Sequence, residues 1–175
     1  MKLFKRTRDG IIVTLPPDHA ELLRELAEQL IELLAGRSAE AAEPVDALLA
    51  QLGIGGATSP SLDPALARLL PDAYRDDEYA ASEHRQLTEL SLIERKIANA
   101  RAVAESLESR PARLDGAATQ SWLRTLTDLR LTIAARLEIA SDDDPGRSDT
   151  ESDRTLHEIY DWLGYLKGML LEVNQ

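Results

Sequence analysis

Apolar residues recur every three or four positions in four long stretches of the chain. This spacing places them on one face of an α-helix. The stretches cover about 18–36, 76–107, 117–140 and 151–173. The first closes on a glycine, which favours helix ends, and the second opens with three acidic residues, which suit the positive end of a helix dipole. The pattern therefore predicts four long amphipathic helices.

The remaining segments predict smaller elements. Residues 2–15 have the pattern of a β-hairpin, because two short apolar-rich runs flank an Asp-Gly turn. Shorter helices are expected at 44–52 and 63–70, and 141–149 is an acidic, breaker-rich loop that we expect to be mobile. Together these elements predict a mainly α fold over a single domain, 1–175. It is a helical bundle of about four long helices plus short helices, with a small N-terminal β-hairpin.

Composition narrows the function classes. The chain has no cysteine, which excludes disulfides, thiolate metal sites and cysteine nucleophiles. No run approaches the roughly 20 apolar residues that span a bilayer, and the charged N-terminus is unlike a signal peptide. We therefore expect a cytoplasmic protein with no membrane association. The formal net charge of −11 repels a phosphate backbone and disfavours nucleic-acid binding.

Catalytic and metal-binding patterns are scarce. His157 and Asp161 lie one helical turn apart, but the second histidine of the zinc-protease helix motif is missing and no third ligand is evident. Asp142, Asp143 and Asp144 lack the spacing of a calcium loop. We expect no catalytic residue, no metal and no cofactor. A metal-dependent enzyme that uses His157 and Asp161 with other helix carboxylates stays as an alternative.

One basic cluster stands out at the N-terminus. Lys5, Arg6 and Arg8, with Lys2 before them, have no acidic neighbour until Asp9. They could contact an acidic protein surface or a nucleic acid, so a DNA-binding hairpin is a second alternative. Charged residues on a hairpin edge also prevent edge-to-edge aggregation without binding anything.

Two tryptophan-containing helices hold the expected structural residues. Trp122 lies on an apolar face, and Asp128 and Arg130 interrupt that helix with charge, which suggests polar contacts that fix helix register. Trp162, with Tyr165 and Met169, lies beside the main stripe of the last helix. This flank is the predicted homodimer face.

Several motifs resemble a known family across nearly the whole chain. They are Arg68-Leu-Leu-Pro-Asp-Ala-Tyr-Arg-Asp-Asp77, Trp122-Leu-Arg-Thr-Leu-Thr-Asp-Leu-Arg-Leu131 and Tyr160-Asp-Trp-Leu163. Together they look like the actinobacterial oxidative-stress regulator (AosR-like) family. It is catalogued as a domain of unknown function, and its genes tend to lie near that of the ClpS adaptor.

The resemblance implies a regulator linked to transcription. Members of that family act through protein contacts with an RNA polymerase σ factor, and in the redox-sensing branch a pair of cysteines is held responsible. This chain has no cysteine. The leading hypothesis is therefore a non-enzymatic protein-interaction module in transcription or the oxidative-stress response.

Overall fold

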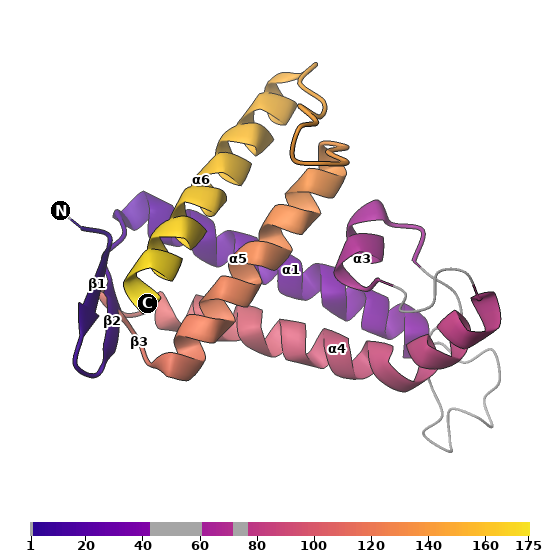
Figure 1. Cartoon of the computed structure of the whole chain (residues 1–175), viewed down its shortest axis with the longest axis horizontal. Coiled ribbons are helices and arrows are strands. Elements are labelled where there is room, and N and C mark those ends of the chain that lie inside the picture. The colour runs from indigo at the N-terminus through magenta and orange to yellow at the C-terminus, as the bar shows by residue number, and fades with distance from the viewer. Residues whose placement is uncertain (1, 43–60, 72–76) are drawn as a thin grey trace.

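The computed structural model describes residues 2–42, 61–71 and 77–175, and it is mainly α, as the sequence predicts. Four long helices dominate the described residues (Figure 1). They are α1 (Pro17–Ala42), α4 (Glu78–Ser106), α5 (Gly116–Arg136) and α6 (Glu151–Asn174). The short helix predicted at 44–52 lies outside the described residues.

The long helices form two crossed pairs. α1 and α4 lie side by side, and α5 and α6 form a second pair that crosses them (Figure 1). A short helix, α3 (Pro64–Leu69), packs against α5. One apolar cluster fills the space between these elements. Leucines of α1, α3, α5 and α6 contribute to it, and α4 contributes isoleucine, alanine and valine. Burial of these stripes supplies most of the free energy that favours folding.

A three-stranded antiparallel sheet closes one end of the bundle (Figure 1). Its strands are β1 (Phe4–Thr7), β2 (Gly10–Val13) and β3 (Ala112–Leu114), in the order β1-β2-β3. The hairpin is confirmed, but the third strand is absent from the sequence prediction. Its only signal is two apolar residues that flank Arg113, and both are buried. Three residues carry too little pattern to reveal a strand whose partner lies about 100 positions away in sequence.

Two predicted helix ends were wrong. The first helix, α1, does not stop at Gly36 but continues to Ala42. Arg37, which follows Gly36, donates from Nε to Oε1 of Glu89 on α4 at 2.6 Å. Packing against α4 thus outweighs the weak preference of glycine for a helix end. α5 stops at Arg136 rather than near residue 140. Glu138 then takes a positive φ of 57°, which reverses the chain and is incompatible with helix.

Trp122 joins the sheet to the bundle. Its side chain is fully buried, its ring meets that of Phe4 edge to face at 6.3 Å, and its Nε1 donates to Ser106 Oγ at 2.9 Å. The indole therefore contacts β1 and the end of α4 from its place on α5. A buried indole needs such a hydrogen-bond acceptor, because an unpaired N–H in an apolar site is costly.

Candidate functional site: a basic groove between four helices

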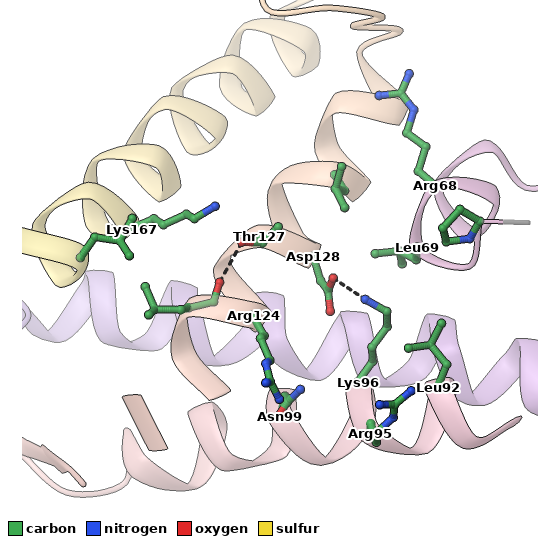
Figure 2. Close-up of a pocket in the computed structure, with 14 residues that line it drawn as sticks. Arg68, Leu69, Leu92, Arg95, Lys96, Asn99, Arg124, Thr127, Asp128 and Lys167 are labelled. Atoms are coloured by element: carbon green, nitrogen blue, oxygen red, sulfur yellow. Dashed lines mark hydrogen bonds and ion pairs between the residues drawn. The ribbon is translucent and has the colours of Figure 1, made fainter. Parts of the chain in front are cut away.

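A groove of about 610 Å³ lies among α3, α4, α5 and α6 (Figure 2). Helical spacing brings its lining together: α4 contributes positions 92, 95, 96 and 99, and α5 contributes 123, 124, 127, 128 and 131. The apolar part of the lining consists of Leu69, Pro71, Leu92, Leu123, Leu131 and Leu171. Leu171 is 44% exposed and adds apolar surface to the groove.

The polar part of the groove is strongly basic. It holds five basic side chains and a single carboxylate, that of Asp128, in a chain whose formal net charge is −11. The basic residues are Arg68, Arg95, Lys96, Arg124 and Lys167. The local charge therefore has the opposite sign to that of the whole molecule. A concave surface of one sign concentrates the field that it presents to a partner.

Lys96 and Asp128 form an ion pair within this lining (Figure 2). The Nζ of Lys96 on α4 donates to Oδ1 of Asp128 on α5 at 2.7 Å, and the two side chains are only 17% and 5% exposed. Burial raises the pKa of Asp128, and the hydrogen bond and charge of Lys96 oppose that rise. This contact compensates one cation and ties α4 to α5.

The other four basic side chains keep their charge available. Within the part of the chain that the structure describes, Arg68, Arg95, Arg124 and Lys167 make no hydrogen bond or ion pair. Figure 2 shows Arg68, Arg124 and Lys167 projecting from three different helices, spread around the groove rather than gathered at one point. The site can therefore attract an extended anionic partner.

α3 forms one side of the groove because its first turn is fixed. Asp63 is the N-cap residue and accepts from the backbone N–H of Ala65 at 2.8 Å. Arg136, at the end of α5, donates to both oxygens of the same carboxylate at 2.9 and 3.0 Å. These contacts set the position from which Arg68 and Leu69 reach the groove.

The predicted basic cluster on the hairpin does not line this groove. Lys5 pairs in register with Ile12 and Arg6 with Ile11, so their side chains point to opposite faces of the sheet. Nη1 of Arg6 donates to the backbone carbonyl of Val173 at 3.2 Å, near the end of α6. Arg8 lies in the turn between the strands and is exposed. The three residues thus form no single basic face.

The charged residues predicted on α5 contact different helices. Asp128 meets Lys96 on α4, whereas the Arg130 guanidinium lies over the Tyr160 ring of α6, 4.2 Å from its centroid. Arg130 also approaches Gly164 closely, where a larger side chain would contact it. The two charges therefore fix α5 to both of its neighbours separately.

The flank predicted as a dimer face is partly covered within the molecule. The Trp162 ring meets His19 of α1 edge to face at 5.3 Å, and Met169 packs against the core. Tyr165, in contrast, is 58% exposed. Of the three residues, Tyr165 presents the largest free apolar surface.

Of the two residues that the metal alternative names, His157 has a local partner and Asp161 is exposed. Nε2 of His157 donates to the backbone carbonyl of Arg147 at 2.7 Å. The carboxylate of Asp144 accepts from the backbone N–H groups of Ala140 and Gly146, both at 2.9 Å, and these bonds lower its pKa. Among residues 2–42, 61–71 and 77–175, no three His, Asp or Glu side chains gather as metal ligands would. The loop at 141–149 is stabilised by the hydrogen bonds between the Asp144 carboxylate and these backbone N–H groups.

A family model covers nearly the whole chain. A model of DUF2017, a domain of unknown function, matches residues 1–173. This chain belongs to the DUF2017 family. Helices of the length and apolarity that a bilayer requires do not occur in its described residues.

Curated relatives of this DUF2017 chain come from mycobacteria. The oxidative stress regulator AosR of Mycobacterium tuberculosis (strain ATCC 25618 / H37Rv) is 33% identical over 187 residues, which cover 95% of this chain and 84% of the relative. A protein of Mycobacterium leprae named as a candidate AosR is 31% identical over 173 residues, with 89% and 78% covered. No solved structure matches the chain. The relatives' names support a regulatory role for this family member.

Proposed function

We propose that this chain is a non-enzymatic, cytoplasmic regulator that acts through protein–protein contacts in the oxidative-stress response. The observation that carries the proposal is the basic groove. Four cations without partners in the described residues lie around an apolar lining that includes the exposed Leu171, in a protein whose net charge is acidic. Apolar surface with one sign of charge around it is typical of a protein-binding site.

The family resemblance sharpens the partner to a transcription protein, with an RNA polymerase σ factor as the leading choice. The relatives' names support the stress-response part of this proposal. Because the chain has no cysteine, a thiol of its own cannot sense the oxidant. In this proposal, either the partner protein senses the oxidant or the cell changes the amount of the regulator. The groove is the surface that binds the partner.

Proximity labelling in an actinobacterial host tests the proposal. The chain is fused to a labelling enzyme, and biotinylated proteins are compared with and without peroxide. A variant with Arg95→Glu and Arg124→Glu serves as the matched comparison. We expect transcription proteins to be enriched by the unaltered chain and reduced by the variant. Labelling at background level for every transcription protein would contradict the proposal.

Direct DNA binding through the hairpin is the weaker second candidate. Lys5 and Arg8 are exposed, but Arg6 is engaged at α6 and lies on the other face of β1 from Lys5. A mobility-shift assay at low salt, where phosphate contacts are strongest, separates the two candidates. A shift that disappears in a Lys5→Glu and Arg8→Glu variant would favour DNA binding over the regulator that acts by protein contact.

A further inference from the structure

We infer that the basic groove binds an acidic amphipathic α-helix of the partner protein. This inference rests on the proposed function and deepens it, because it names the chemistry of the partner segment. Three features of the groove decide the choice: the sign of its charge, the order of its apolar and basic side chains along the helices, and the spread of its cations.

The sign of the charge selects an acidic segment. A partner segment that brings carboxylates to Arg68, Arg95, Arg124 and Lys167 compensates cations that have no carboxylate partner among the described residues. The formal net charge of −11 disfavours acidic segments over the molecule as a whole, so the groove offers them a local attraction that the average surface does not. Electrostatic complementarity of this kind contributes mainly to association rate and specificity.

The order of side chains selects an amphipathic helix. On α5, Leu123 and Leu131 lie on one face about 12 Å apart, at 1.5 Å per residue, and Arg124 lies beside the first of them. On α6, Lys167 and Leu171 are one turn apart. Each of the two helices thus brings leucine and one cation to the groove. A helix with leucines at i, i+4 and i+7 and carboxylates on either side presents the complementary pattern.

The spread of the cations argues against a small anion. A phosphate-sized ligand needs donors that converge on one point, whereas Arg68, Arg124 and Lys167 project from separate helices around the groove (Figure 2). Six apolar residues in the lining would gain nothing from such an ion. An extended nucleic acid would meet the same apolar surface and the repulsion of the whole chain.

A designed peptide tests the inference directly. The probe is a fluorescein-labelled peptide of about 18 residues, long enough to form a helix. It carries leucines on one face, glutamates on either side and alanines elsewhere. A scrambled peptide of equal composition removes the amphipathic pattern, and a Glu→Gln peptide removes the charge. Binding to the full chain is measured by fluorescence anisotropy at low and high salt.

We expect the acidic amphipathic peptide to bind and both control peptides to bind at least about ten-fold more weakly. Arg95→Glu with Arg124→Glu should weaken binding by a similar factor of about ten or more. Leu171→Ser should weaken it too, because the leucine supplies apolar contact. The matched control is Arg101→Glu with Arg154→Glu, which reverses two exposed arginines of α4 and α6 that do not line the groove. Circular dichroism checks that every variant is folded.

Besides a failure of the designed peptide to bind, three results would overturn the inference. The scrambled peptide could bind as well as the designed one, inorganic polyphosphate could compete at equal charge concentration, or the control variant could lose binding to the same extent. The first two would show an unspecific anion site, and the third a non-local charge effect. If labelling of transcription proteins persists in the Arg95→Glu and Arg124→Glu variant while the peptide does not bind, the proposed function stands and the groove is not its contact site.

Discussion

Arg136 and Asp63 join α5 to α3 through two parallel hydrogen bonds. Arg136 is the last residue of α5, and Asp63 is the N-cap residue of α3. Their contact therefore connects the C-terminal end of α5 to the N-terminal end of α3. The hydrogen bond from Arg136 lowers the pKa of Asp63. Because α3 brings Arg68 and Leu69 to the groove, this contact helps to set the groove's shape.

Replacing Asp63 by Asn should reduce stability in a pH-dependent way. Asn keeps the helix cap but loses the charge, so we expect a loss of about 0.5–1 kcal/mol at pH 7 for this partly exposed pair. Since the folded-state pKa is lowered, the contribution of Asp63 is full above about pH 4 and is lost as the pH falls through the folded pKa. Urea unfolding at pH 7 and at pH 3 measures this. A difference that stays constant down to pH 2 would contradict the assignment, and Asp161→Asn at an exposed position is the control.

Asp128→Leu should destabilise the chain by about 1–3 kcal/mol, because it leaves Lys96 largely buried without its carboxylate. The double variant Lys96→Met with Asp128→Leu should lose less than the sum of its single changes, since both charges are removed together. Urea unfolding of all four proteins closes the cycle. Additive losses would show that the pair does not couple α4 to α5.

The same pair has a pH signature opposite to that of Asp63. Burial raises the pKa of Asp128, so its contribution is full below about pH 4 and is lost as the pH rises through the folded pKa. The stability of the wild type relative to the double variant should therefore fall as the pH rises above about 4. A pH-independent difference would contradict the raised pKa.

Gly10→Ala should be the most damaging of the glycine substitutions. Gly10 has φ +142°, and an added Cβ would collide with the backbone carbonyl of Leu114 in β3. We expect a loss of about 2 kcal/mol or more in urea unfolding. Gly36→Ala is the matched control, because nothing lies within 4 Å of its Cβ position in α1 and alanine favours helix by about 0.5–1 kcal/mol. Equal effects at the two positions would contradict the sheet register.

Arg6→Gln should lower stability, whereas Lys5→Gln and Arg8→Gln should not. Arg6 places a cation and a donor at the negative end of α6, which contributes about 0.3–1 kcal/mol at an exposed helix end. Thermal unfolding followed by circular dichroism compares the three variants. If all three leave the midpoint unchanged, the contact with Val173 has no energetic weight.

The homodimer that the sequence predicts through α6 should depend on Tyr165. The side chain is 58% exposed, whereas Trp162 and Met169 pack within the molecule. Tyr165→Glu should therefore shift sedimentation equilibrium toward the monomer, and Glu158→Gln on the same helix should not. A wild-type chain that sediments as a monomer at high concentration refutes this proposal.

Local pattern was sufficient for most of the fold. Leucine spacing predicted the four long helices, and the Asp-Gly turn predicted the hairpin. The ends of the helices were harder to predict, because contacts between residues far apart in sequence help to determine them. The helix α1 continues past Gly36, where Arg37 contacts Glu89 of α4. The strand Ala112–Leu114 could not be predicted, since its pairing partner in β2 is remote in sequence.

By itself, the sequence determined the amphipathic helices, the absence of cysteine chemistry and the acidic charge, because each depends only on neighbouring residues or on composition. The tertiary structure alone decided which stripes face one another. Arg68, Arg95, Arg124 and Lys167 lie on three different long helices and α3, and nothing local distinguishes them from other surface cations. They line one groove only because the packing of the apolar helix faces brings these four basic side chains around a common space.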